Sequence, residues 1–377
     1  MNYNTCCPYF PPQDIKSILS EFREILDGKG VLTMGRHVQK FEAEFAAYAG
    51  VKYAVATNSC TSGLEIALRS LGIGKGDEVI VPVQTFVATG SSVLTTGADV
   101  VFCNIDSNFL LDLEDLKKKI TRRTKAVIIV HFAGLIHPEI VVIKEFLEQK
   151  KVALIEDAAH ACGAAVNNRR AGTFGDIGCF SFFATKVMTT GEGGMIVVND
   201  KNLFKLCSSM RNRGLDLEAS YERYSMLGSN RRMSEVQGIL GCHQLRRLDK
   251  FVSHRNMIAK VYRDELCDLA DAEQIAFQEY PASIRHAYWR FVIFLKNTKI
   301  NRNSLKKLLL DKGIRIDWPY QPLLHLQPLF RNMASIRKGL YARSERLAET
   351  HICLPIHLGI NKSEAGYIAA CLRKYIH

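Results

Sequence analysis

The 377-residue sequence has no long hydrophobic run and no secretory signal. No apolar stretch reaches the roughly 18 residues that a membrane-spanning helix needs, and residues 1–17 lack a basic region followed by an apolar core. We therefore expect a soluble, cytoplasmic protein with no membrane partner. CxxC pairs are absent as well: the eleven cysteines are scattered, and Cys103, Cys162 and Cys179 lie in hydrophobic runs. This pattern predicts reduced core cysteines rather than disulfides or a metal site.

Nucleic-acid-binding motifs are also lacking, although the formal net charge is +12. The basic residues are dispersed, and only short clusters occur, at 116–125 and 229–233. A solvated surface explains dispersed charge as well as a nucleic-acid site does, so we expect no nucleic-acid partner and favour an anionic small-molecule ligand. The stretch GIGKGDE (72–78) resembles a P-loop only superficially, because the first glycine of that motif would fall on Arg69.

Between residues 51 and 198, short β-rich runs alternate with helical stretches. Seven strands are predicted, at 52–57, 77–83, 99–105, 125–132, 152–157, 176–182 and 194–199. Several are apolar on both faces, which favours an α/β fold with a mostly parallel sheet that is covered on both sides. Ligands of such a sheet bind at the carboxyl ends of its strands.

The remaining sequence predicts a second, smaller domain. Residues 233–269 are helical and amphipathic, and long enough to link two domains. Beyond them we expect strands at 289–295 and 314–318 and helices at 301–313 and 362–376, which together make a small α+β domain. We place the division at residue 250, with a large domain and an N-terminal arm in 1–250 and the small domain in 251–377.

Lys186 lies in an unusual segment, SFFATKVMTTGEGG (181–194). A β-rich run leads into it, apolar side chains flank the lysine, and three glycines follow. Most lysines keep their ammonium groups in water. In partly apolar surroundings a lysine loses basicity and can act as an amine nucleophile, above all for a Schiff base to a carbonyl or to pyridoxal phosphate.

Asp157 ends the predicted strand 152–157. A carboxylate that follows an apolar strand is costly to leave unpaired, so it needs a cationic or hydrogen-bonding partner. It is either the N-cap of a following helix or the partner of a ligand. The ring nitrogen of pyridoxal phosphate, which must stay protonated for the ring to accept electrons, would be such a partner.

A phosphate site is predicted where the strand 52–57 runs into a helix. The first turn of that helix holds Thr61, Ser62 and Gly63, and its free N–H groups suit an anion. Ser62 and Glu65 also match a capping box, and both interpretations can hold together. Phe86 follows the next strand and could lie flat on a pyridine ring, although such an aromatic residue is also common in a core.

Taken together, these motifs resemble the sugar-nucleotide aminotransferase family of fold type I pyridoxal-phosphate enzymes. The stretches NSCTSGLEIAL, IEDAAHACGA, FGDIGCFSFFATKVMTTGEGGM, SNRRMSEVQGILG and LPIH carry the resemblance, which runs in order from about residue 35 to residue 354. It implies a large domain with a mixed, mostly parallel seven-stranded sheet. The cofactor it implies is pyridoxal 5'-phosphate.

The resemblance also implies roles for individual residues. Lys186 matches the Schiff-base lysine and Asp157 the partner of the pyridine nitrogen; the other cofactor contacts are Phe86 as the stacked aromatic residue and Thr61, Ser62 and Ser181 at the phosphate. Asn230 matches an asparagine that reaches the neighbouring subunit's cofactor, which implies a homodimer. His160 stands where many members have glutamine, and either can hydrogen-bond the phenolic oxygen of the cofactor. Arg231 and His325 lie in regions on the substrate side, where Arg231 could face either a substrate phosphate or solvent.

The implied function is amino-sugar biosynthesis, such as that of lipopolysaccharide or other glycans. L-Glutamate would be the amino donor, and a 3-keto or 4-keto nucleotide-linked hexose or deoxyhexose the acceptor, with Lys186 moving the proton between substrate and cofactor. Related dehydratases carry histidine at the lysine position, so Lys186 favours transamination. Two alternatives are an aminotransferase that acts on a keto-cyclitol and a non-catalytic, cofactor-binding regulator.

Overall fold

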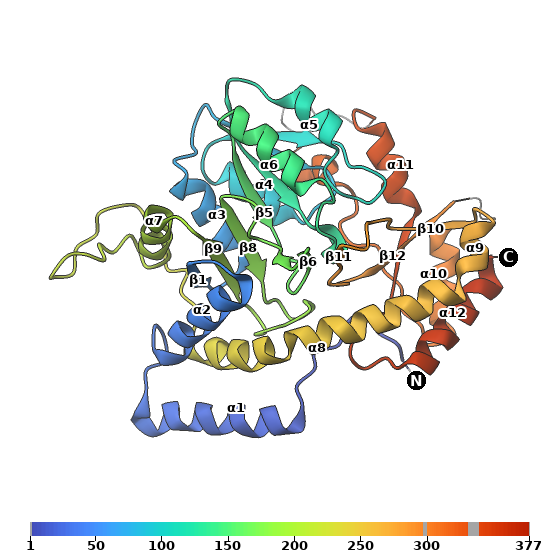
Figure 1. Ribbon diagram of the computed structural model, residues 1–377, viewed down its shortest axis with the longest axis horizontal. Coiled ribbons are helices and arrows are strands. Elements are labelled where there is room, and N and C mark those ends of the chain that lie inside the picture. The colour runs from blue at the N-terminus through green and yellow to red at the C-terminus, as the bar shows by residue number, and fades with distance from the viewer. Residues whose placement is uncertain (1, 297–299, 331–338, 377) are drawn as a thin grey trace.

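The computed structural model describes residues 2–296, 300–330 and 339–376. Its centre is a seven-stranded sheet, drawn in Figure 1, in the order β1 (Tyr53–Thr57), β9 (Gly194–Val198), β8 (Ile177–Ser181), β5 (Ala153–Asp157), β4 (Thr124–Val130), β2 (Glu78–Pro82) and β3 (Asp99–Cys103). Strand β9 is antiparallel to both neighbours, and the other adjacent pairs are parallel. All seven predicted strands and the mostly parallel α/β sheet are thus confirmed.

Helices cover both faces of this sheet. One core cluster contains residues of α2 (Arg36–Ala49), α5 (Leu113–Lys119), α6 (Ile140–Gln149) and α8 (Glu235–Glu265), and the other contains residues of α3 (Cys60–Ser70), α4 (Val87–Leu94) and α7 (Lys201–Arg211). Along β4, Val127 and Ile129 belong to the first cluster, whereas Ala126 and Ile128 belong to the second. Alternate side chains point to opposite faces, which explains why the strands are apolar throughout.

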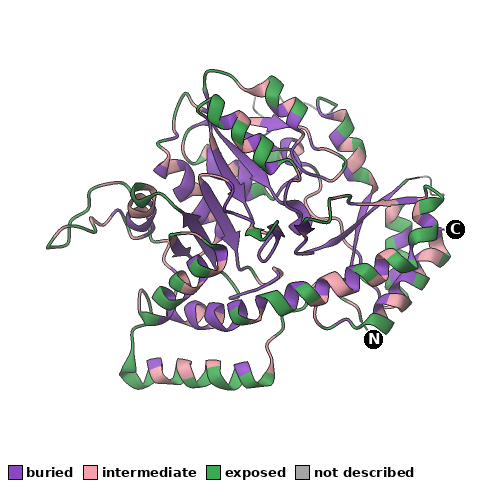
Figure 2. Ribbon diagram, in the orientation of Figure 1, coloured by how far each residue is buried: buried purple, intermediate pink, exposed green. Residues whose placement is uncertain are grey.

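The long helix α8 connects the large sheet to the C-terminal elements (Figure 1). It begins at a capping box, in which the Ser234 hydroxyl accepts from the Gln237 N–H and the Gln237 side chain accepts from the Ser234 N–H. The helix has 31 residues, so the predicted division at residue 250 falls inside it. Buried residues occur along its length, as Figure 2 shows; Leu245 and Leu248 belong to a core cluster of the large sheet, and Ile258 and Tyr262 to the cluster of the C-terminal layer.

The C-terminal elements form an α+β layer beside the end of α8. Its antiparallel sheet has the order β10 (Ile275–Phe277), β12 (Phe291–Leu295) and β13 (His351–Leu354), and its helices are α9 (Cys267–Asp271), α10 (Arg302–Leu310) and α12 (Lys362–Ile376). The strand predicted at 289–295 and the helices at 301–313 and 362–376 are confirmed.

The strand predicted at 314–318 is wrong. Ile314 and Ile316 are buried, which produces the alternating pattern of a strand. The backbone pairs only at two isolated bridges, from Ile314 to Tyr3 and from Asp317 to Cys353. A segment of alternating burial therefore crosses the layer here without continuous strand pairing.

Several segments of the C-terminal half return to the large sheet. Strand β11 (Ile284–Arg285) pairs with β6 (Ala165–Val166), which in turn pairs with β7 (Arg169–Arg170). Leu323, Leu324 and Phe330 pack with the α3 face of the sheet, as do residues near α11 (Ala342–Thr350). The short helices in this region are η3 (Leu324–Leu326) and η4 (Pro328–Phe330); η2 (Phe132–Gly134) follows β4.

Helix α1 (Pro12–Glu24) and the turn η1 (Ile25–Lys29) form the N-terminal arm, which lies along α8 in Figure 1. Arg247 of α8 pairs with Asp14, at 2.7 Å, and His243 contacts Glu21, at 2.9 Å. Within the described residues, no helix combines the length and the apolar character needed to cross a bilayer.

Candidate active site

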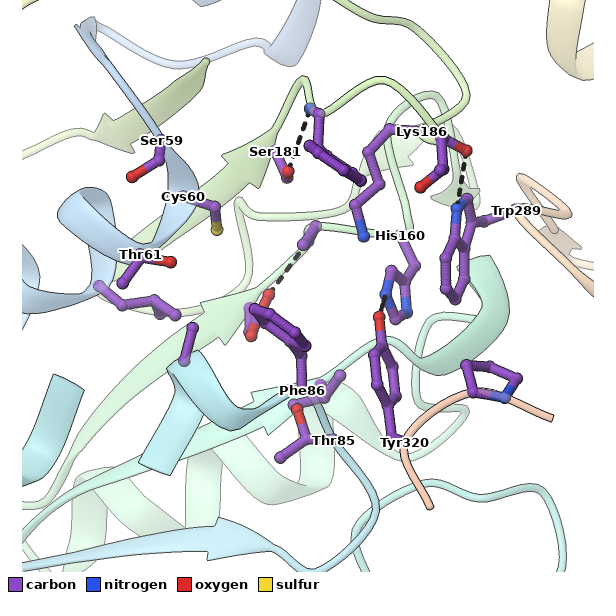
Figure 3. Close-up of a pocket in the computed structure, with 18 of the residues that line it drawn as sticks. Ser59, Cys60, Thr61, Thr85, Phe86, His160, Ser181, Lys186, Trp289 and Tyr320 are labelled. Carbon is purple, nitrogen blue, oxygen red and sulfur yellow. Dashed lines mark hydrogen bonds between the residues drawn. The ribbon is translucent and has the colours of Figure 1, made fainter. Parts of the chain in front are cut away.

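A cavity of about 460 Å³ opens at the carboxyl ends of β5 and β8 and at the N-terminus of α3. Figure 3 shows the side chains that converge on it. Six of the predicted site residues line it: Thr61, Phe86, Asp157, His160, Ser181 and Lys186. Residues from distant parts of the sequence complete the wall, among them Thr85, Trp289, Arg290 and Tyr320.

Lys186 points into this cavity from the irregular segment between β8 and β9. The segment is held by a hydrogen bond from the Lys186 N–H to the Phe183 carbonyl, at 2.9 Å, and by the Trp289 indole N–H, which donates to the Thr185 carbonyl, also at 2.9 Å. The Nζ atom lies 4.4 Å from the Trp289 ring centroid. Burial lowers the pKa of Lys186 to about 8, although Asp157 opposes this shift. Near neutral pH a useful fraction of the amine is thus a free nucleophile.

Asp157 ends β5 and is only 5% exposed. Its Oδ2 accepts from the Thr89 hydroxyl at 2.8 Å, and its Oδ1 accepts from the Ala159 N–H at 3.2 Å. The Thr89 hydroxyl lies 2.7 Å from that of Thr85, so a chain of hydroxyls orients the carboxylate. Among the described residues Asp157 has no ion-pair partner, and burial raises its pKa.

The N-cap interpretation of Asp157 is wrong, because turns rather than a helix follow β5. A buried carboxylate in a cavity wall, held only by neutral donors, is suited to a cationic N–H group of a ligand. The protonated nitrogen of a pyridine ring is such a group. The donor set of this cavity therefore fits pyridoxal phosphate.

The first turn of α3 provides the expected anion site, but its N-cap is Ser59 rather than Ser62. The Ser59 hydroxyl accepts from the Ser62 N–H at 3.2 Å, while the N–H groups of Cys60 and Thr61 have no intrahelical partners. The predicted capping box between Ser62 and Glu65 is wrong: Ser62 lies inside the first turn, and Glu65 forms an ion pair with Arg231. Ser62 contacts Ser59 and does not line the cavity.

One glycine of the GEGG sequence is explained by this helix end. A Cβ atom on Gly194 would lie 2.5 to 2.6 Å from backbone atoms of Ser59 and Cys60. Strand β9 therefore passes against the start of α3, and only glycine permits that approach. Ser181, at the end of β8, lines the same part of the cavity.

Three aromatic rings form the neighbouring part of the wall. The His160 ring stacks on Trp289 with centroids 3.8 Å apart and planes within 12°, and it lies nearly parallel to Tyr320. The His160 Nε2 atom lies 2.8 Å from the Tyr320 hydroxyl. Burial, and then the nearby charges of Lys186 and Arg290, hold the pKa of His160 well below its ordinary value, so the ring is neutral. Phe86 is 50% exposed at the cavity, with its centroid 5.6 Å from that of Tyr320.

Sequence reasoning missed Trp289, Arg290 and Tyr320. Trp289 and Arg290 begin the predicted strand 289–295, and no sequence pattern distinguishes Tyr320 from its neighbours. The guanidinium of Arg290 is buried in the cavity wall, 3.2 Å from Asp317 and above the Trp289 ring. The only signal in the sequence is the aromatic and basic pair that directly precedes strand β12, and it concerns Trp289 and Arg290 but not Tyr320.

Besides Ser62, three predicted residues lie outside the cavity lining: Asn230, Arg231 and His325. Asn230 is exposed and bridges to Asn212 through its backbone, and Arg231 pairs with Glu65. His325 requires a correction: its ring is fully buried, with Nε2 3.1 Å from the Glu345 carboxylate and its ring against Tyr341. Its apolar neighbourhood makes it a core residue rather than a substrate contact.

Comparisons with known proteins find similar chains over nearly the whole length of this one. The model of the DegT/DnrJ/EryC1/StrS aminotransferase family matches residues 12–373. GDP-perosamine synthase of Escherichia coli O157:H7 is 33% identical over 354 residues, which cover 93% of each chain. UDP-N-acetyl-3-dehydro-alpha-D-glucosamine 3-aminotransferase of Acidithiobacillus ferrooxidans is 34% identical over 388 aligned residues, covering 100% of each. The crystal structure of DesV from S. venezuelae, in complex with a ketimine intermediate, is 29% identical, with a TM-score of 0.90 and coverage of 98% and 99%.

Proposed function

Because the chain belongs to the DegT/DnrJ/EryC1/StrS aminotransferase family and is therefore a transaminase, we propose that it transfers an amino group from L-glutamate to a keto nucleotide-linked hexose, at the 3 or the 4 position. The observation that carries this proposal is one cavity that holds a lysine of lowered pKa, a buried carboxylate without a cation, and a free helix N-terminus.

Aminotransferases of this family depend on pyridoxal phosphate, and we propose that residues of this cavity hold it. Asp157 would bind the ring nitrogen, and Phe86 would contact the face of the ring. The N–H groups at the start of α3, with Thr61 and Ser181, would bind the phosphate. Lys186 would bind the aldehyde carbon covalently. The bound cofactor supplies an electron sink.

Lys186 has a second task in this proposal. Its amine lies in the cavity beside the Trp289 face, where it would carry the proton between the substrate carbon and the cofactor. A pKa near 8 suits this role, because the amine can both accept and return a proton near neutral pH. The carboxylate of Asp157 would keep the ring nitrogen of the bound cofactor protonated.

The proposed substrates are inferred from the charge of the cavity wall and from the substrates that the names of the relatives give. The buried guanidinium of Arg290 lines the cavity and offers a cation to the carboxylate of an amino donor such as L-glutamate. The names of the two relatives given above place their substrates among nucleotide-linked sugars. We extend that substrate class to this chain. Asn230 lies on an exposed loop outside its own cavity, and we propose that it reaches the site of a second copy in a homodimer.

The proposal is tested with the purified, cofactor-loaded protein. Visible absorbance of the lysine-bound cofactor should disappear when L-glutamate is added and return when the correct keto sugar is added. Lys186→Ala should lose both changes, whereas Lys150→Ala, at an exposed lysine, should keep them. Turnover by Lys186→Ala would refute the mechanism.

A panel of acceptors distinguishes the substrate classes. We expect amination of a 3-keto or 4-keto sugar linked to a nucleoside diphosphate, and little with free keto-cyclitols. A preference for cyclitols would overturn the substrate assignment. Normal cofactor loading with no response to any amino donor would instead indicate a non-catalytic cofactor-binding regulator.

A further inference from the structure

The hydroxyl of Tyr320 and the ring of His160 form a buried hydrogen bond in the cavity wall. The hydroxyl oxygen lies 2.8 Å from His160 Nε2, and Figure 3 shows both side chains beside Lys186. The stacked Trp289 ring, whose indole N–H is bonded to Thr185, holds the imidazole plane. The two groups are thus fixed with respect to each other and to the lysine segment.

The partners of His160 indicate which of its nitrogens carries the hydrogen. Within the described residues, His160 Nδ1 is buried and has no hydrogen-bond partner. A buried N–H without an acceptor is rarer and costlier than a buried nitrogen lone pair without a donor. The favoured neutral tautomer therefore carries its hydrogen on Nε2. In that tautomer, His160 donates to the Tyr320 oxygen.

This direction leaves the hydrogen of Tyr320 free. Burial, and then the negative charge of Asp157, raise the pKa of Tyr320, so the hydroxyl stays protonated. The charged groups that face the pair are Lys186, Arg290, Asp157 and Asp317, and the further titratable groups near it are His131 and Cys353. Because His160 satisfies an acceptor position of the hydroxyl, the hydrogen can turn toward the cavity that Tyr320 lines.

We propose that Tyr320 donates a hydrogen bond to an oxygen of the bound ligands and that His160 is the positioning residue that aims it. This inference rests on the proposed function. Two oxygens share the required chemistry: the phenolic oxygen of the cofactor and the carbonyl oxygen of the keto sugar. When nitrogen replaces that carbonyl oxygen, the oxygen leaves as water, and a fixed donor stabilises the negative charge that develops on it. The hydrogen bond requires no net loss of a proton from Tyr320.

The central test is Tyr320→Phe, which keeps the ring and removes the hydroxyl. If the acceptor is the cofactor, the pH midpoint of the visible absorbance of the loaded protein, measured without substrate, should rise by about one unit. In the wild type, a hydrogen bond donated to the anionic phenolic oxygen would weaken the binding of the proton that this oxygen shares with the lysine nitrogen. Without the donor that proton is bound more tightly, so the midpoint rises. If the acceptor is the sugar carbonyl, the midpoint should stay unchanged, and the half-reaction with the keto sugar should slow about 10²-fold while that with L-glutamate is unaffected.

Substitutions of His160 test the aiming role. His160→Gln retains a side-chain N–H donor and should keep most of the wild-type behaviour, whereas His160→Leu should show the change seen for Tyr320→Phe. Tyr341→Phe is the matched control, because Tyr341 is also buried and its hydroxyl donates to the Phe102 carbonyl outside the cavity lining. It should leave the absorbance midpoint and both half-reactions unchanged.

The inference is overturned if Tyr320→Phe loads cofactor, leaves the pH midpoint of the absorbance unchanged, and keeps the rates of both half-reactions within twofold of wild type. It is also overturned if both half-reactions slow equally with no change in midpoint, since that result indicates a structural role. Failure of the proposed function would be seen separately: the wild-type protein itself would then show no half-reaction with any donor or acceptor.

Discussion

Two groups of side chains meet in the cavity and differ in how their polar atoms are satisfied. The first group, here called the charged group, consists of Lys186 and Asp157 with the first turn of α3. Among the residues that the structure describes, its amine and its carboxylate form no ion pair, and the first N–H groups of α3 have no intrahelical partner. The second, the aromatic group of His160, Trp289 and Tyr320, is stacked and hydrogen-bonded within itself and to the lysine segment. The difference indicates that the charged group is suited to ionic and covalent contacts with a ligand, whereas the aromatic group is suited to holding the Tyr320 hydroxyl in a fixed position.

The largest expected effect is that of Asp157→Asn. The amide cannot hold a protonated ring nitrogen by charge, so we expect kcat to fall by about 10²- to 10³-fold. Because burial disfavours the carboxylate, the cofactor-free variant should be at least as stable as the wild type. Thermal unfolding and steady-state kinetics measure the two quantities. Asp200→Asn, at the N-cap of α7, is the matched control and should change neither. A large loss of cofactor-free stability would contradict a ligand role for Asp157.

The charged group also predicts how stability depends on pH. The pKa of Lys186 is depressed in the folded, cofactor-free protein, to about 8. Its stabilising contribution is therefore complete above the unfolded pKa of about 10.4 and is lost as the pH falls through 8. Solvent screening at this half-buried side chain sets the loss at ~1 to 3 kcal/mol. Urea unfolding of the wild type and of Lys186→Met, compared at pH 7 and pH 10, measures it as the difference between the two proteins. Parallel pH profiles would show that the amine is not desolvated.

His325 is close in sequence to Tyr320 of the aromatic group, so a substitution at His325 tests whether that closeness implies a role in the site. His325 lies five residues from Tyr320 in sequence, but it is bonded to Glu345 in the core. His325→Asn should reduce the free energy of unfolding by about 1 to 3 kcal/mol, because it leaves buried polar atoms poorly paired. The KM for the keto sugar should not change. A KM increase in a variant of normal stability would return His325 to the substrate site.

The smallest expected effect is that of Trp289→Phe. The smaller ring can still stack on His160, but the hydrogen bond to the Thr185 carbonyl is lost. A buried hydrogen bond of this kind contributes about 0.5 to 1.5 kcal/mol. We therefore expect the cofactor dissociation constant to rise by up to about tenfold, with little change in kcat. Equilibrium binding of pyridoxal phosphate measures this constant. An unchanged constant would show that the hydrogen bond from Trp289 does not position the lysine segment for cofactor binding.

The charged group could be predicted because its residues occupy informative positions in the sequence. Asp157 ends an apolar strand, Lys186 interrupts an apolar segment, and Thr61 lies where a strand runs into a helix. Residue type and local pattern marked these positions as candidates, and the resemblance to the aminotransferase family supplied their roles. The capping details were not predictable in the same way, because Ser59 and Ser62 are both good capping residues and only the start of the helix decides between them.

The aromatic group could not be predicted from local pattern. Trp289 and Tyr320 are 129 and 160 residues away from His160 in sequence, and nothing in the spacing of these residues encodes a parallel stack. The same limit explains the error at 314–318, where the alternating burial of Ile314 and Ile316 reflects packing against the C-terminal layer rather than strand pairing. Alternation reports which side chains are buried but not which backbone groups pair.

By itself, the sequence determined the seven strands, the long helix α8, and the identity of the lysine, the carboxylate and the helix end that make the charged group. These features depend on periods of a few residues and on the cost of burying charge, and both can be read locally. Only the tertiary structure decided that Trp289, Arg290 and Tyr320 enter the cavity, and that His325 and Arg231 do not line it. Those outcomes depend on how β11, β12 and the segment at 317–330 fold back onto the large sheet, and long-range packing of that kind has no counterpart in local sequence.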